Sequence, residues 1–97
     1  MAGYYWIKLH HSLLNDARFG TLPDRLYRRL IELFLLAGKH SQEGRLPDVS
    51  VLAWELRLPV AELRGDLDDL ERAGFIRRID SGWLVVDFEA SQAPVKG

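Results

Sequence analysis

Arginine and lysine side chains are the residues of this chain best suited to chemistry, and that chemistry is the binding of nucleic-acid phosphates. A guanidinium group stays charged at neutral pH and presents several N–H donors to phosphate oxygens. The candidates for DNA contact are Arg77, Arg78, Arg28, Arg29, Arg64, Arg72 and Lys8. Arg77 and Arg78 lead this group, because a charged strand can lie along the minor groove or the DNA backbone. The alternative for this pair is a strand edge kept soluble by its charge.

The distribution of charge argues against simple binding of DNA by the middle of the chain. The formal net charge is −1, and residues 47–74 carry three basic against seven acidic side chains. A helix predicted over residues 59–73 has acids on its outward face, which opposes insertion into a phosphate-lined groove. This face suits a basic protein partner, or it is a solvated surface with an Arg64–Asp68 pair. The candidate partner-binding residues are Trp54, Trp6, Asp68 and Asp69.

Catalysis, metal binding and a bound cofactor are not expected from the residue types present. The chain has no cysteine, and its serines lack the glycine context of a nucleophile elbow. No glycine-rich phosphate loop is present. His10 and His11 are adjacent and therefore point apart, and His40 stands alone without a ligand-like spacing.

Length and composition indicate one soluble domain. With 97 residues, 47% hydrophobic and 28% charged, the chain forms a single core. We expect a domain over residues 1–90 and a flexible tail or linker over 91–97, where the composition is that of a linker. There is no signal peptide and no apolar run long enough to span a bilayer, so membrane association is not expected. The absence of cysteine favours the cytoplasm.

The first half of the chain must supply the core. Residues 4–9 are rich in aromatic and β-branched types and predict a short strand, followed by a short helix near residues 10–15. Thr21 as a cap and Pro23 in the first turn predict the start of a helix, which is expected to reach about Leu36. Its second half is apolar on most sides, which indicates a core helix or a dimer contact.

The second half predicts two helices and a hairpin. Pro47-Asp48 opens one helix, and Pro59 ends it and opens a second, which stops at Ala73-Gly74. Strands follow over residues 75–79 and 83–88, joined by a turn at 80–82. This order is that of a winged helix-turn-helix. The fold class expected is α+β, with about four helices, a C-terminal β-hairpin wing and a short N-terminal strand.

The sequence also resembles a family. It is similar over nearly its whole length to the winged-helix domain at the front of phage replisome organisers and bacterial DnaD-type primosome proteins. The matching passages are Tyr5-Trp6-Ile7-Lys8-Leu9, Gly44-Arg45-Leu46, Leu52-Ala53-Trp54-Glu55-Leu56-Arg57-Leu58, Leu67-Asp68-Asp69-Leu70-Glu71-Arg72-Ala73-Gly74-Phe75-Ile76 and Phe88-Glu89-Ala90-Ser91-Gln92. The opening passage and Gln92 are the most specific of these, since the others occur in many winged-helix regulators.

Two functions remain open. The resemblance implies a non-catalytic module of replication initiation that binds DNA and helps to assemble a nucleoprotein complex with other replication proteins. The alternative is a protein-interaction or oligomerisation module, such as a homodimer, on a winged-helix scaffold without direct DNA contact. The acidic character of the helix over residues 59–73 favours the second function for that surface.

Overall fold

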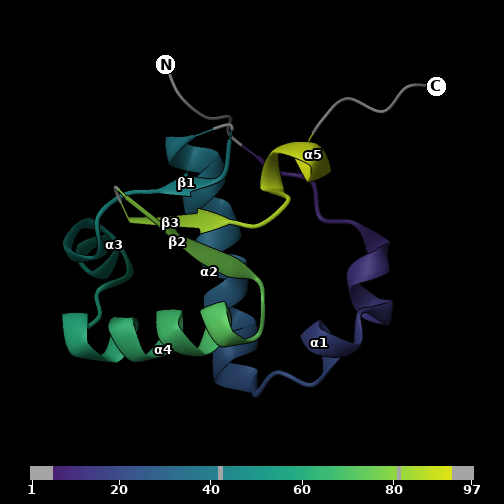
Figure 1. Ribbon diagram of the computed structural model, residues 1–97, viewed down its shortest axis with the longest axis horizontal. Coiled ribbons are helices and arrows are strands. Elements are labelled where there is room, and N and C mark those ends of the chain that lie inside the picture. Colours follow the sequence, from purple (N-terminus) through teal and green to yellow (C-terminus); the bar gives the residue numbers. More distant parts are fainter. Residues whose placement is uncertain (1–5, 42, 81, 93–97) are drawn as a thin grey trace.

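The structure, a computed structural model, describes residues 6–41, 43–80 and 82–92. Within these ranges the chain is α+β, as predicted, with five α-helices, one 3₁₀-helix and a three-stranded antiparallel sheet (Figure 1). In chain order the elements are η1 His11–Asn15, α1 Ala17–Gly20, α2 Asp24–His40, β1 Arg45–Leu46, α3 Val49–Leu56, α4 Val60–Arg72, β2 Ile76–Ile79, β3 Gly82–Val85 and α5 Phe88–Gln92. Among these helices, none has the length and apolar character needed to cross a bilayer.

The long helix α2 runs through the middle of the molecule. It begins directly after Pro23, so the predicted cap at Thr21 is wrong. The Thr21 hydroxyl instead donates a 2.9 Å hydrogen bond to the carbonyl of Ala17 and closes the end of α1. Helix α2 also continues past the predicted end at Leu36 to His40. Burial of Ala37 and Gly38 explains the extension, because packing outweighs the low helix propensity of glycine.

Two helices joined by a short turn follow, as the sequence predicts. The Asp48 side chain caps α3 by accepting a 3.0 Å hydrogen bond from the Ser50 N–H. The chain then turns between Arg57 and Pro59 into α4. Leu63, Leu67 and Leu70 of α4 are buried, whereas Val60, the first residue of the helix, is exposed.

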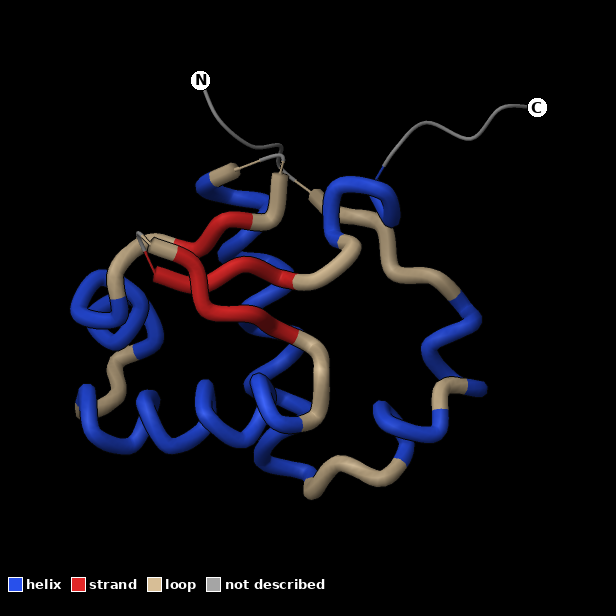
Figure 2. The backbone as a smooth tube through the Cα atoms, viewed as in Figure 1, coloured by secondary structure: helices blue, strands red, loops and turns tan. Residues whose placement is uncertain are grey.

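The predicted hairpin is present, but the sheet is larger than the hairpin (Figure 2). Strand β1 pairs with β3 and makes the order β1-β3-β2. A two-residue strand shows no alternation that a sequence could reveal. Strand β3 ends at Val85, before the predicted end at Phe88, because Asp87 takes a left-handed conformation with φ 60° and turns the chain into α5.

The two ends of the described chain lie together, which corrects two predictions. Residues 6–10 form no strand; instead, the Gln92 side chain holds the backbone of Lys8. Its Oε1 accepts from the Lys8 N–H at 2.7 Å, and its Nε2 donates to the Lys8 carbonyl at 2.9 Å. Ser91 and Gln92 therefore belong to α5 rather than to a loose tail. Residues 93–97 of the predicted tail, and residues 4 and 5 of the predicted strand, lie outside the described residues.

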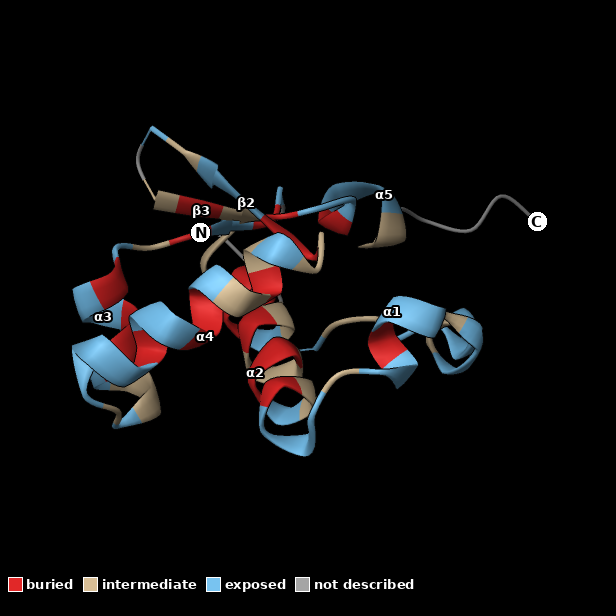
Figure 3. Cartoon of the chain, turned by 60° about the horizontal axis from the view of Figure 1, so that its bottom comes forward, coloured by how far each residue is buried: buried red, intermediate tan, exposed pale blue. Residues whose placement is uncertain are grey.

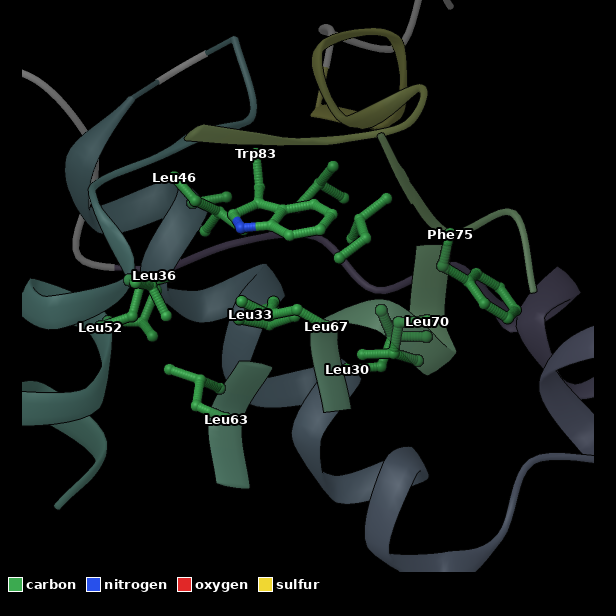
Figure 4. Packing of buried hydrophobic residues seen from close by; sticks show 14 of the residues in the cluster. Leu30, Leu33, Leu36, Leu46, Leu52, Leu63, Leu67, Leu70, Phe75 and Trp83 are labelled. Carbon is green, nitrogen blue, oxygen red and sulfur yellow. The ribbon is translucent and has the colours of Figure 1, made fainter. Parts of the chain in front are cut away.

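Helices α2, α3 and α4 pack on one side of the sheet, and their apolar faces meet there (Figures 3 and 4). Leu33 of α2, Leu67 of α4 and Trp83 of β3 are at the centre of this core. The opposite face of the sheet carries Arg45, Leu84 and Arg77 in one cross-strand row, and its two arginines are exposed. The layout is compatible with a winged-helix-like arrangement.

An ionic contact joins the end of α2 to α3. The Nζ of Lys39 lies 2.9 Å from Glu55 Oε2, and the Nε2 of His40 lies 2.7 Å from Glu55 Oε1. The hydrogen bond from Lys39 lowers the pKa of Glu55, and His40 adds to this effect, while burial opposes it. Glu55 therefore stabilises the fold most when it is ionised.

We expect this contribution to disappear in acid. The unfolded-state pKa of Glu55 is near its ordinary 4.5, and the folded-state pKa is lower, so the stabilisation is complete above pH 4.5 and is lost as pH falls through the folded-state pKa. Urea denaturation gives the difference in unfolding free energy between the wild type and Glu55→Gln. This difference should shrink as pH falls below 4.5 and through the folded-state pKa. Glu43→Gln is the exposed control. A pH-independent difference for Glu55→Gln would contradict the expectation.

Candidate nucleic-acid interface

Arg28 and Arg29 point in different directions, as expected of adjacent helical residues. Arg28 is exposed and lies 3.4 Å from Glu32, one turn further along α2. Arg29 is only 7% exposed; its Nε donates a 2.8 Å hydrogen bond to Asp66 Oδ2, and its Nη1 contacts Glu32. Burial would lower the pKa of Arg29, but Asp66 and Glu32 outweigh it and raise that pKa. Arg29 is therefore removed from the candidate DNA-binding residues, because its guanidinium is used inside the fold.

Asp66 is the partner that the sequence interpretation missed. Asp66 belongs to the acidic helix α4, but it does not lie on the outward face, because it is 0% exposed. Its second oxygen, Oδ1, lies 2.9 Å from Nη1 of Arg25, an ionic contact that lacks hydrogen-bond geometry. The sequence does indicate that Asp66 is buried. It follows Leu63 by three residues and precedes Leu70 by four, which places all three on one helix face.

Of the four remaining acids of α4, Asp68 and Asp69 have arginine partners, whereas Glu62 and Glu71 have no ion pair with a described residue. Asp68 lies 3.7 Å from Nη2 of Arg78, and no ion pair with Arg64 is found among the described residues. Asp69 contacts Arg72 and lies 3.7 Å from Nη2 of Arg25. These pairs reduce the negative charge that α4 presents to solvent. They also mean that Arg72 and Arg78, both predicted to bind DNA, already have acidic partners.

Arg77 and Arg78 lie on opposite faces of the hairpin. Arg78 is paired across the sheet with Trp83, on the inner face, and its guanidinium carbon lies 4.5 Å from the centre of the Trp83 ring. Arg77 is paired with Leu84 and points to the open face. The two arginines therefore cannot act as one phosphate-binding pair, and Arg77 is the one available to a ligand.

Three exposed arginines have no ion pair with any described residue. They are Arg57, Arg64 and Arg77. They lie in the α3–α4 turn, on the outward face of α4 and on β2, while the other described arginines all have an acidic neighbour. Arg64 also lies near the start of α3, since its charge helps to lower the pKa of Asp48, after the larger effect of hydrogen bonds from Ser50.

Arg57, which the sequence analysis did not propose as a site residue, adopts an unusual backbone conformation. It closes α3 in the left-handed region, with φ 59° and ψ 47°. Glycine is the usual residue at such a helix end, because a Cβ is strained there. The sequence signal is the lack of any glycine between α3 and α4, which forces a side chain into the turn.

Gly65 is the opposite case on the neighbouring helix. It lies within α4 on the exposed side, and a Cβ placed there would meet no atom within 4 Å. Glycine in a helix interior is about 1 kcal/mol less favourable than alanine. The described structure gives no packing reason for it, so this part of α4 has a flat surface that a partner can approach closely.

Gly65→Ala is therefore expected to raise the unfolding free energy by about 1 kcal/mol, since alanine favours the helix and meets no obstacle. Gly38→Ala in α2 is the matched comparison, because its Cβ would collide with the side chain of Ile7. Chemical denaturation followed by circular dichroism should show a gain for the first variant and a loss for the second. A lower unfolding free energy for Gly65→Ala would contradict the open space that the structure shows around this position.

The predicted partner-binding residues do not form one site. Trp54 is 81% exposed on α3, beside Val51, which is also exposed. Trp6 is exposed in the N-terminal segment, whereas Asp68 and Asp69 form ion pairs with arginines. Lys8, a predicted DNA contact, lies in the N-terminal segment and not in α3 or α4. Its backbone is hydrogen-bonded to Gln92 of α5.

Arg57, Arg64 and Arg77 thus remain as candidates for contact with a nucleic acid; they come from the α3–α4 turn, the outward side of α4 and the open face of the sheet. None of the three makes an ion pair with a described residue, although the charge of Arg64 acts on Asp48. Comparisons with protein-family models, curated proteins and solved structures find no match to this chain. The role of these arginines is therefore argued from their chemistry.

Proposed function

We propose that this chain is a winged-helix domain that binds duplex DNA without catalysis, as a module of a replication-initiation complex. The observation that carries the proposal is the set of unpaired arginines, Arg57, Arg64 and Arg77, in the turn, the second helix and the wing. Each of these three elements reaches DNA in proteins that use this arrangement. The order of helix, short strand, two helices and hairpin supports the winged-helix assignment.

The roles of the three arginines follow from their positions. Arg64 lies on the side of α4 that faces away from the core, which is the side that enters the major groove. Gly65 beside it lets the helix approach the DNA closely. Arg57 and Arg77 are placed to bind phosphates at the turn and along the wing, because both are exposed and charged.

Two departures from local stability support a role for this surface. Arg57 occupies a position that favours glycine, and Gly65 occupies one that favours alanine. Each choice costs about 1 kcal/mol, and both lie on the proposed binding surface. Departures of this kind concentrate at functional sites, where binding outweighs local stability.

The test is fluorescence anisotropy of the wild-type domain with a labelled duplex at low salt. We expect saturable binding, with unlabelled duplex competing better than single-stranded DNA of the same length. Absence of binding at about 50 mM salt, where phosphate contacts are strong, would overturn the proposal.

A second function is favoured by Trp54. A tryptophan that is 81% exposed next to exposed Val51 suits a protein contact, because aromatic side chains supply much of the energy at protein interfaces. If α3 mediates self-association, light scattering should show a dimer that Trp54→Ser converts to a monomer. Leu14→Ser, at another exposed apolar residue, is the control. A wild-type domain that stays monomeric at high concentration would exclude self-association through this face.

A further inference from the structure

A cavity separates the N-terminal segment from the body of the domain. Figures 1 and 3 show η1 and α1 standing apart from α2, on the side where α5 lies. The space between them has a volume of about 410 Å³. This lies within the range of cavities that hold small organic molecules.

The walls of this cavity are part apolar and part polar, and three of the apolar residues are phenylalanines. They come from four parts of the chain: Leu13 of η1, Phe34 of α2, Phe75 before β2, and Val85 with Phe88 around the last turn. Figure 4 shows the Phe75 ring turned toward the N-terminal segment and away from the central leucines. Three aromatic rings around one space favour a flat or compact apolar ligand.

Several polar groups at the rim are already used by the protein, whereas the side chains of Ser12 and Asp87 have no hydrogen bond or ion pair with a described residue. Both ends of the Gln92 amide bind the Lys8 backbone, and His10 Nε2 lies 2.6 Å from the Ser91 carbonyl oxygen. Arg18 lies 3.3 Å from Asp16, and its guanidinium also covers the Phe75 ring. An anionic ligand would lose its hydration at this rim beside the carboxylates of Asp16 and Asp87, and Arg18 is already paired with Asp16.

We propose that the cavity is a binding site for an uncharged, aromatic small molecule. Such a ligand buries its surface against Leu13 on one side and Phe34 and Phe88 on the other. It therefore links the N-terminal segment to α2 and α5, which the hydrogen bonds of Gln92 to the Lys8 backbone already hold together. The site is independent of the DNA-binding surface, since it contains none of Arg57, Arg64 and Arg77.

The probe is indole, with indole-3-acetate as its charged counterpart, titrated into the ¹⁵N-labelled domain and followed by amide chemical shifts. We expect saturable shifts in η1, in residues 85–88 and in α5, and binding of indole at least about tenfold tighter than that of indole-3-acetate. No saturable shift at millimolar indole, or tighter binding of the acid, would overturn the proposal.

A cavity-filling variant locates the binding. Leu13→Trp places a large ring in the space and should weaken indole binding at least about tenfold. Leu14→Trp is the matched control, because Leu14 is 80% exposed and does not line the cavity. Val86→Phe, with Val51→Phe as control, repeats the test if Leu13→Trp does not fold. Equal weakening of indole binding by a filling variant and its control would contradict binding in this cavity. Line broadening that depends on protein concentration and not on indole concentration would also contradict it.

Discussion

Asp66→Ala is expected to lower the free energy of unfolding by about 3–5 kcal/mol, the range observed when one partner of a buried ion pair is removed. Asp66 is 0% exposed and binds Arg29, which is itself buried between α2 and α4. Without the carboxylate, the Arg29 guanidinium keeps only Glu32 as an acidic neighbour. Native proteins have a total stability of about 5–15 kcal/mol, so this loss would be a large fraction of the total.

Asp68→Ala is the matched control for this prediction. Asp68 lies on the same helix, but its side chain is half exposed and its ion pair with Arg78 is long. An exposed pair of this kind contributes about 0–1 kcal/mol. Urea denaturation followed by circular dichroism should therefore separate the two variants clearly. Similar, small losses for both would show that Asp66 and Arg29 are not buried as a pair.

Arg64→Ala combined with Arg77→Ala should weaken binding to duplex DNA on the order of 100-fold. A hydrogen bond to a charged group contributes about 1.5 kcal/mol or more, and 1.4 kcal/mol corresponds to a tenfold change in affinity. Both side chains are exposed and make no ion pair with a described residue, so their removal should leave the fold intact. Fluorescence anisotropy gives the affinity, and thermal denaturation checks stability.

Arg18→Ala combined with Arg28→Ala removes the same charge from arginines that have acidic neighbours outside the proposed surface. This control should weaken binding only slightly, through the general loss of positive charge. If both double variants lost affinity equally, DNA would be held by overall charge and not by Arg64 and Arg77.

The helices and hairpin around the proposed interface could be predicted because local rules determine them. Pro59 must end one helix and permits the next, and the spacing of Leu63, Leu67 and Leu70 defines the buried side of α4. The positions of Arg64 on the outside of α4 and of Arg77 on the wing follow from the same periodicities.

Features that depend on distant contacts could not be predicted in this way. Strand β1 exists only because β3 lies beside it, and α5 packs where Gly44, at φ 91°, leaves room for Phe88. The burial of Arg29 with Asp66 joins residues on two helices, and no local pattern pairs them. The hydrogen bonds of the Gln92 side chain to the Lys8 backbone also join residues far apart in the sequence, and no local pattern predicts them.

The salt dependence of DNA binding tests the proposed interface most directly. Each arginine that contacts a phosphate contributes about −0.9 to the slope of the logarithm of the association constant against the logarithm of salt concentration. Arg64→Ala combined with Arg77→Ala should therefore make the wild-type slope less negative by about 1.8, while the Arg18 and Arg28 control leaves it nearly unchanged. A slope that is the same in the wild type and in the Arg64 and Arg77 variant would contradict direct phosphate contact by these arginines.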